Sequence, residues 1–173
     1  MSQIPIGVEV ERHRAAITRV ELSRPVRLAI ESGIMTIDTT IFDYGCGIGG
    51  DVKRLKSAGY TCEGWDPYYF PDVARQPADL VNLSYIINVI EDPEERDRAL
   101  IQAWELTGQV LIVAAQILVN DLRGVLAYGD GILTKRNTFQ KYYQQVELKE
   151  YIDRVLTVDA IPIGLGIFLV FRD

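Results

Sequence analysis

The segment Asp43-Tyr44-Gly45-Cys46-Gly47-Ile48-Gly49 decides which fold is expected of this chain. It follows a short apolar strand over residues 40–43 and precedes a helical stretch from Asp51 to Ala58, which Gly59 closes. Glycines at such a junction let the backbone come close to a ligand, because side chains there would block the approach. The segment therefore predicts a strand, a glycine turn and a helix, with a ligand held at the turn.

Strands and helices alternate along the rest of the chain. The patterns predict further strands over residues 61–65, 79–84 and 109–114, and further helices over residues 92–106 and 139–156. Residues 157–171 are expected to form two strands joined through Pro162 and Gly164. Such alternation implies an α/β fold with a doubly wound, mostly parallel sheet and helices on both faces, to which the terminal hairpin adds an antiparallel strand.

Capping residues mark two helix starts. Ser23 and Pro25 predict a helix start within a helical pattern that runs from residue 10 to about residue 33. Asp92 is expected to cap the helix over residues 92–106, with Glu95 reaching back to complete a capping box.

Length and composition indicate an ordinary globular protein. Of the 173 residues, 48% are apolar and 24% are charged. We expect one domain over residues 37–173, with residues 1–36 as a helical extension packed on it. The net charge of -6 argues against a broad basic surface that grips nucleic acid.

Several classes of protein are excluded by what the sequence lacks. The start of the chain has no signal-peptide pattern and no apolar run is long enough to span a bilayer, so we expect a cytoplasmic protein without membrane contact. Two cysteines without CxxC spacing and a single histidine predict no metal site.

Two cofactors fit the glycine turn. Residues 45–50 satisfy the G-x-G-x-x-G pattern of dinucleotide sites. Asp43, just before the first glycine, attracts a cationic group and repels a pyrophosphate, and ordinary dinucleotide folds do not require the terminal hairpin. We therefore expect S-adenosylmethionine, whose amino-acid end is cationic, and keep a nicotinamide-dependent oxidoreductase as an alternative.

A second carboxylate, Asp66, ends the next strand, where it can accept hydrogen bonds from both ribose hydroxyls of either cofactor. Strand-end capping by the two aspartates and a simple tight turn at the glycines are the alternative explanation. The predicted cofactor-binding residues are Asp43, Gly45, Cys46, Gly47, Gly49, Asp66, Pro67 and Ser84.

Residues 43–49 and 64–67 resemble the motifs of the class I S-adenosylmethionine-dependent methyltransferases. A closer resemblance, to the methyltransferases associated with DNA phosphorothioation gene clusters, covers almost the whole chain and is carried by residues 13–17, 22–25, 88–93 and 133–141. It implies a Rossmann-like fold and methyl transfer to a nucleic-acid-linked substrate in DNA modification or defence, with nucleic acid or a DNA-modification complex as partner. Members of that family are often longer, so the resemblance implies an N-terminal domain or a short member.

The chain departs from the class I pattern after Asp66. Residues 67–78 leave no space for the helix, strand and helix that these enzymes usually have there. The carboxylate that normally meets the adenine amino group has no counterpart, and one sheet edge is expected to be shortened. Tyr68, Tyr69 and Phe70 either cover the adenine ring or plug this edge. A non-catalytic cofactor-binding or interaction module is therefore an alternative to an enzyme.

Methyl transfer is an in-line displacement, so the catalytic candidates are residues that align the nucleophile or take its proton. Tyr85 and Asn88 follow the strand next to the glycine turn and are expected to face the methyl group, with a loop-stabilising role as the alternative. His13 is the only histidine, the residue type that exchanges protons near neutrality, with a structural role as the alternative. Asn82 is expected to lie inside its strand, so its likeness to an Asn-Pro-Pro-Tyr loop is interpreted as accidental.

Residues 135–143 interleave cations with aromatic side chains, a composition suited to nucleic acid. Phe139, Tyr142 and Tyr143 also have the spacing of a buried helical stripe, which we favour.

Overall fold

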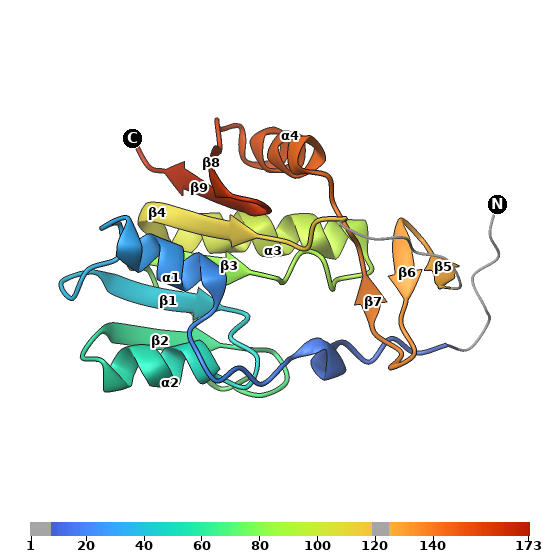
Figure 1. The fold of residues 1–173 in the computed structure, drawn as a ribbon, viewed down its shortest axis with the longest axis horizontal. Helices are drawn as coiled ribbons and strands as arrows, with labels where there is room; N and C mark the ends of the chain where they lie inside the picture. Colours follow the sequence, from blue (N-terminus) through green and yellow to red (C-terminus); the bar gives the residue numbers. More distant parts are fainter. Residues whose placement is uncertain (1–7, 119–124) are drawn as a thin grey trace.

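The computed structural model describes residues 8–118 and 125–173 and shows a mixed six-stranded sheet with helices on both faces (Figure 1). The strands of this sheet are β1 (Thr40–Tyr44), β2 (Thr61–Trp65), β3 (Ala78–Ser84), β4 (Thr107–Ala114), β8 (Ile161–Gly164) and β9 (Ile167–Phe171). The helices are η1 (Arg12–Ala15), α1 (Arg24–Glu31), α2 (Gly50–Ser57), α3 (Pro93–Leu106) and α4 (Gln145–Leu156).

The strand order is β2-β1-β3-β4-β9-β8. Strands β1 to β4 are parallel, and β9 runs antiparallel to both β4 and β8. The predicted doubly wound, mostly parallel sheet with a terminal antiparallel hairpin is therefore confirmed.

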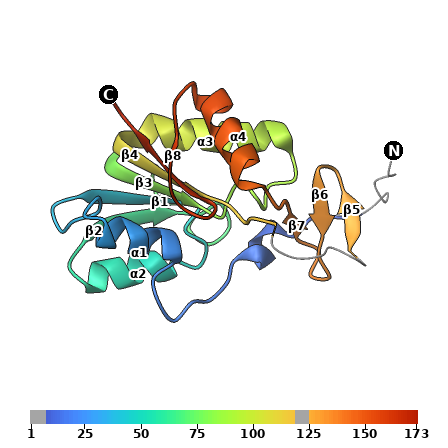
Figure 2. The same ribbon diagram turned by 45° about the horizontal axis from the view of Figure 1, so that its top comes forward.

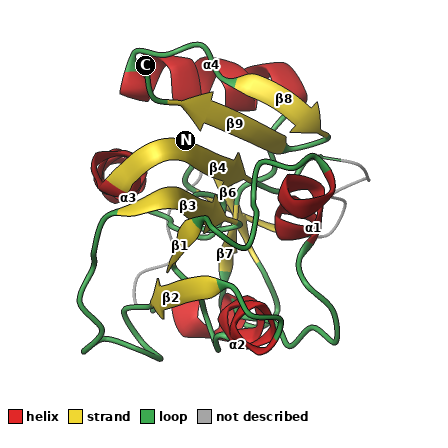
Figure 3. Ribbon diagram, turned by 90° about the vertical axis from the view of Figure 1, so that its left-hand side faces the viewer, coloured by secondary structure: helices red, strands yellow, loops and turns green. Residues whose placement is uncertain are grey.

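Each face of the sheet carries its own apolar core, because successive side chains of a strand point to opposite faces. In β4, Leu111 and Val113 belong to the core that α3 and α4 cover, whereas Val110 and Ile112 belong to the core that α1 and α2 cover. Figure 3 shows the helices on the two sides of the sheet. All four side chains are buried, which explains why this strand is a continuous apolar run in the sequence.

The predicted shortening of one sheet edge is also confirmed. Strand β2 is the edge strand, and residues 67–77 form turns whose one recorded pairing is a bridge between Asp66 and Phe70. In the part of the chain that the structure describes, no helix has the length and apolar character needed to cross a bilayer.

Residues 8–20, here called the N-terminal strap, do not form the helix that the pattern predicted. Their one regular element is the single 3-10 turn η1, in which no residue is buried. The prediction was wrong because the strap crosses the carboxyl end of the sheet, where it has no core against which to bury an apolar face. By contrast α1 packs through Val26 and Ala29 into one of the two main cores, so residues on both sides of position 36 share a core.

The predicted helix over residues 139–156 begins only at Gln145. Before it lies a small three-stranded sheet of β5 (Leu126–Tyr128), β6 (Gly131–Leu133) and β7 (Phe139–Gln140). The first part of the helix prediction was wrong: Phe139 and Tyr143 are buried, as the stripe suggested, but they belong to β7 and the segment after it. Strands this short do not show a recognisable alternation of apolar and polar residues in the sequence.

Capping and turn predictions were partly correct. Ser23 takes the N-cap position of α1 without forming a side-chain capping bond. Asp92 caps α3 by accepting from the Glu94 amide at 3.0 Å, but Glu95 does not reach back because it binds Arg12 instead. The hairpin turns after β8, at Leu165 and Gly166, rather than at Pro162 and Gly164, which lie within β8.

The small sheet is anchored to α3 by Arg96, which is buried. Its guanidinium donates two hydrogen bonds to Asp130, at 2.7 and 3.0 Å, and two to the carbonyl of Ile90, at 3.2 and 2.8 Å. The small sheet and the N-terminal strap therefore lie together at the carboxyl end of the parallel strands (Figure 2).

Candidate functional site

The turn between β1 and α2 has a backbone that requires glycine. Gly45 and Gly47 have φ angles of 83° and 56°, in the left-handed region that strains other residues. A Cβ added to Gly45 would lie 2.4 Å from Ile86 Cδ1. The amides of Gly45 and Cys46 donate to the Trp65 carbonyl, which ties the turn to β2. The Ile86 side chain therefore packs directly on Gly45, and the turn borders the space above it.

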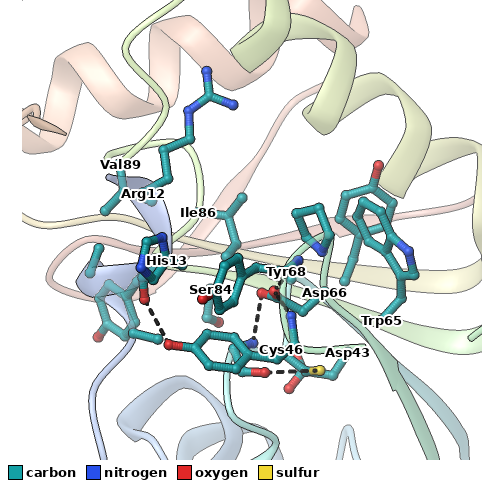
Figure 4. Close-up of a pocket in the computed structure, with 18 of the residues that line it drawn as sticks. Arg12, His13, Asp43, Cys46, Trp65, Asp66, Tyr68, Ser84, Ile86 and Val89 are labelled. Carbon is teal, nitrogen blue, oxygen red and sulfur yellow. Dashed lines mark hydrogen bonds between the residues drawn. The ribbon is translucent and has the colours of Figure 1, made fainter. Parts of the chain in front are cut away.

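That space is a cavity of about 930 Å³ at the carboxyl ends of β1, β2 and β3 (Figure 4). Its lining includes seven of the eight predicted cofactor-binding residues: Asp43, Gly45, Cys46, Gly47, Asp66, Pro67 and Ser84. The eighth, Gly49, is the N-cap of α2 and is not part of the lining. The sequence motifs and the cavity thus coincide.

Asp43 is the buried acid of the cavity. The residue is 7% exposed, and the Asn82 amide donates to its Oδ1 at 3.0 Å. Burial, followed by the charge of Asp51, raises the pKa of Asp43 to about 7, although the hydrogen bond from Asn82 opposes this rise. A cation bound beside Asp43 would lower that pKa again, so the carboxylate favours a cationic ligand.

Asp66 joins the glycine turn to the next turn. Its Oδ1 accepts from the amides of Tyr68 and Tyr69 at 2.9 and 3.0 Å, and its Oδ2 accepts from the Gly47 amide at 3.1 Å. Strand-end capping, the alternative explanation for Asp66, is therefore a real part of its role. A carboxylate offers about four acceptor positions, so Oδ2 retains capacity for a ligand hydroxyl.

Asn82 belongs to the site, although its likeness to an Asn-Pro-Pro-Tyr loop was interpreted as accidental. It lies within β3, as expected, but it is directly opposite Asp43 in the parallel register of β1 and β3. Its amide nitrogen donates to Asp43 while its oxygen accepts from the Ser84 hydroxyl. The signal that could have found it is the pairing register rather than a motif.

The three predicted catalytic residues lie in different surroundings. Tyr85 lines the cavity with a φ of 61°, a conformation that costs a non-glycine residue on the order of 1–3 kcal/mol, and Arg19 lies over its ring at 5.5 Å. Asn88 is 1% exposed and outside the lining, and its carbonyl accepts from the Lys141 amide. The structure therefore brings Tyr85, but not Asn88, to the cavity.

His13 also lines the cavity, but its ring is engaged. It stacks on Tyr68 with 4.1 Å between ring centroids and 11° between planes, and Tyr69 donates its hydroxyl to the His13 carbonyl at 2.9 Å. A role of His13 as a base stays a prediction.

The N-terminal strap is held over the cavity by ion pairs and hydrogen bonds. Arg12 binds Glu91 and Glu95 at 2.7 and 2.6 Å, and Arg54 on α2 donates to the main-chain carbonyls of Arg19 and Val20. Residues between Glu9 and Arg19 consequently form part of the cavity wall.

Cys46 lies in the cavity wall but is not suited to act as a nucleophile. Burial, together with the charges of Asp43 and Asp66, raises the pKa of its thiol to about 12. The thiolate, the nucleophilic form of cysteine, is therefore strongly disfavoured at neutral pH.

The fold is similar to those of solved methyltransferases. Against 1,6-didemethyltoxoflavin-N1-methyltransferase of Burkholderia thailandensis, solved with S-adenosylhomocysteine and 1,6-didemethyltoxoflavin, the TM-score is 0.61 at 12% identity, covering 94% of this chain and 78% of that chain. Against magnesium protoporphyrin IX methyltransferase of Synechocystis PCC 6803 the TM-score is 0.59 at 12% identity, covering 94% of each chain. Against the CcbJ methyltransferase of Streptomyces caelestis the TM-score is 0.55 at 12% identity, covering 94% of this chain and 95% of that chain.

No protein-family model and no curated protein sequence matches the chain. The structural similarities establish the α/β, Rossmann-like fold of the class I methyltransferases, with a mixed sheet whose C-terminal strands are antiparallel.

Replacing Asp43 with asparagine should raise stability increasingly as pH rises. The pKa of about 7 in the folded chain lies above the value of about 3.9 expected in the unfolded chain. Between these values the unfolded chain ionises Asp43 more readily, so the wild type loses stability as pH rises, until Asp43 is ionised in both states. Asp43→Asn keeps an acceptor for Asn82 and carries no charge.

Urea unfolding at pH 5, 6, 7 and 8 measures this effect. The difference in free energy of unfolding between Asp43→Asn and the wild type should grow with pH and level off above about pH 7. Asp38→Asn removes a carboxylate from an exposed turn and serves as the control. A difference for Asp43→Asn that stays constant over this range would contradict the buried-acid assignment.

Proposed function

We propose that the protein is an S-adenosylmethionine-dependent methyltransferase. The observation that carries the proposal is the buried carboxylate of Asp43 beside a glycine turn that lines the cavity, in a fold shared with solved methyltransferases. Asp43 would bind the cofactor's ammonium group, the glycine turn would pack against its amino-acid end, and Asp66 would bind its ribose.

The residues present fit this cofactor. Gly45 and Gly47 line the cavity, and their left-handed φ angles favour residues without a Cβ, so a bound ligand can come close to the backbone there. Asp43 would be paired with a positive charge that the chain does not place there: within the described ranges its hydrogen-bond donor is the neutral amide of Asn82. The literal G-x-G-x-x-G string fits a nicotinamide cofactor less well, because Asp43 would face its phosphates.

When bound, the cofactor would supply a methyl group made electrophilic by the sulfonium. The chain's own residues position the reactants. Asn82 and Ser84 orient the Asp43 carboxylate through consecutive hydrogen bonds. Burial raises the pKa of the Tyr85 phenol, although Arg19 and Arg24 oppose this, so Tyr85 stays protonated near neutrality. Its hydroxyl is then suited to hydrogen-bond an acceptor molecule rather than to remove a proton.

The proposed acceptor is linked to nucleic acid in a DNA-modification or defence context, in the cytoplasm, with nucleic acid or a DNA-modification complex as partner. This part rests on the sequence resemblance. Lys135 and Arg136 support it, because they are exposed on the turn that contacts the N-terminal strap through the hydrogen bond between the Glu11 amide and the Asn137 carbonyl, at 2.8 Å. The other aromatic and basic residues of the segment 135–143 do not add support for a nucleic-acid-linked acceptor. Phe139 and Tyr143 are buried, and Lys141 pairs with Glu147.

Calorimetry with S-adenosylmethionine at pH 8 tests the cofactor assignment. The wild type should bind, and Asp43→Asn should bind at least about tenfold more weakly because a charge-assisted bond to the ammonium is lost. Asp38→Asn, on an exposed turn, should bind like the wild type. Absence of binding by the wild type would contradict the assignment of S-adenosylmethionine as cofactor. Thermal protection by NAD but not by S-adenosylhomocysteine would favour a nicotinamide-dependent oxidoreductase.

Transfer of a labelled methyl group tests activity separately from binding. We expect label in DNA or RNA, and a rate roughly tenfold lower for Tyr85→Phe with unchanged affinity for S-adenosylhomocysteine, because the variant removes only a hydroxyl. Label in small molecules or proteins instead would contradict the nucleic-acid acceptor. Cofactor binding without transfer to any of these would favour the non-catalytic module.

A further inference from the structure

The cavity extends past Asp66 toward two different walls. Figure 4 shows His13 and Trp65 on opposite sides of Asp66, and both line the cavity. A cofactor held by Asp43 at one end and Asp66 in the middle must place its base against one of these walls.

The wall at His13 offers no slot for another ring. With 4.1 Å between their centroids and 11° between their planes, the rings of His13 and Tyr68 are in direct stacking contact. A base inserted between them would need about twice this separation. Tyr68 and Tyr69 thus contact the N-terminal strap.

The wall at Trp65 combines aromatic and polar side chains. Residues 67–77 form turns rather than a helix or strand, so the cavity reaches Tyr44, Trp65, Arg75, Ala99 and Gln102. We call this part of the cavity the edge groove. It lies between the shortened edge of the sheet and α3.

Gln102 is held in a defined orientation in the edge groove. The Tyr44 hydroxyl donates to its Oε1 at 2.7 Å, and Arg75 Nη1 donates to the same atom at 2.9 Å. Because a guanidinium has no acceptor, the atom that faces Arg75 must be the carbonyl oxygen of Gln102. Arg75 is itself held over the Trp65 ring at 4.8 Å. The amide nitrogen of Gln102 has no hydrogen-bond partner within residues 8–118 and 125–173.

We propose that the edge groove binds the adenine base of S-adenosylmethionine, with the Gln102 amide as hydrogen-bond donor to the base. This inference rests on the proposed function. Gln102, fixed by Tyr44 and Arg75, takes the place of the carboxylate that the shortened segment after Asp66 lacks. Such a site supplies a donor instead of an acceptor, so it does not select for the exocyclic amino group of adenine.

The recognition of the base is tested by calorimetry with S-adenosylhomocysteine and S-inosylhomocysteine, in which a carbonyl replaces the amino group. The wild type should bind the two within about threefold of each other, because an amide donor can bond to a ring nitrogen of adenine or to the carbonyl of hypoxanthine. Gln102→Leu should bind both about tenfold more weakly, since one hydrogen bond is lost.

Gln102→Glu keeps the acceptor for Tyr44 and Arg75 but replaces the donor with a carboxylate. It should prefer the adenine ligand by about tenfold or more, because a carboxylate accepts from an amino group and repels a carbonyl. Gln109→Leu, at an exposed position of β4, is the matched control and should bind like the wild type. Unfolding temperatures of all variants separate loss of fold from loss of binding.

The outcomes distinguish this inference from the proposed function. If the wild type binds S-adenosylhomocysteine and both Gln102 variants bind the two ligands as the wild type does, the edge groove is not the base site and the methyltransferase assignment stands. If the wild type binds neither ligand, both are overturned.

Discussion

A carboxylate buried at the end of a central strand is the constraint on which the rest of the site depends. Asp43 lies at the carboxyl end of β1, and it is buried because β2 and β3 flank that strand and the glycine turn folds over its end. Removing an ionised carboxylate from water is costly unless an opposite charge replaces the lost hydration. The neighbours of Asp43 add to this cost: Asp51 and Asp66 both raise its pKa, and Asn82 offsets only part of the rise. A cationic ligand is what such a site lacks.

The parts of the fold that the sequence predicted are those with local signals. Glycines at a strand end and the cap at Asp92 each report on a few adjacent residues, and they located the glycine turn and α3 correctly. The spacing between Asp66 and Asp79 predicted the shortened edge because a chain segment that short cannot form a further strand and helices.

The parts that escaped prediction depend on contacts between distant residues. The N-terminal strap has its conformation because Arg12 meets Glu91 and Glu95, which no local pattern reports. Asn82 belongs to the site through strand register, and Gln102 reaches the cavity through the groove that the missing elements leave open. For Asn82 and Gln102 the sequence indicated the strand or helix but not its partner, whereas for the N-terminal strap it indicated the wrong element.

The fold limits the chemistry of the site without choosing the acceptor. Proteins of this fold include one named for 1,6-didemethyltoxoflavin and one named for magnesium protoporphyrin IX, so the fold is compatible with unrelated acceptors. In this chain the N-terminal strap covers the cavity and contacts the small sheet of β5 to β7. Acceptor selection would therefore fall to these peripheral segments, whereas Asp43 and the glycine turn would serve the cofactor.

The most direct measurement of the role of Asp43 is the number of protons released when S-adenosylmethionine binds, obtained by calorimetry at pH 6 in buffers of different ionisation enthalpy. With a pKa of about 7, Asp43 is mostly protonated in the free protein at this pH, and it must ionise to pair with the ammonium group. We expect the wild type to release close to one proton more than Asp43→Asn. Equal proton release by the two proteins would contradict the assignment of Asp43 as the buried acid that binds the cofactor.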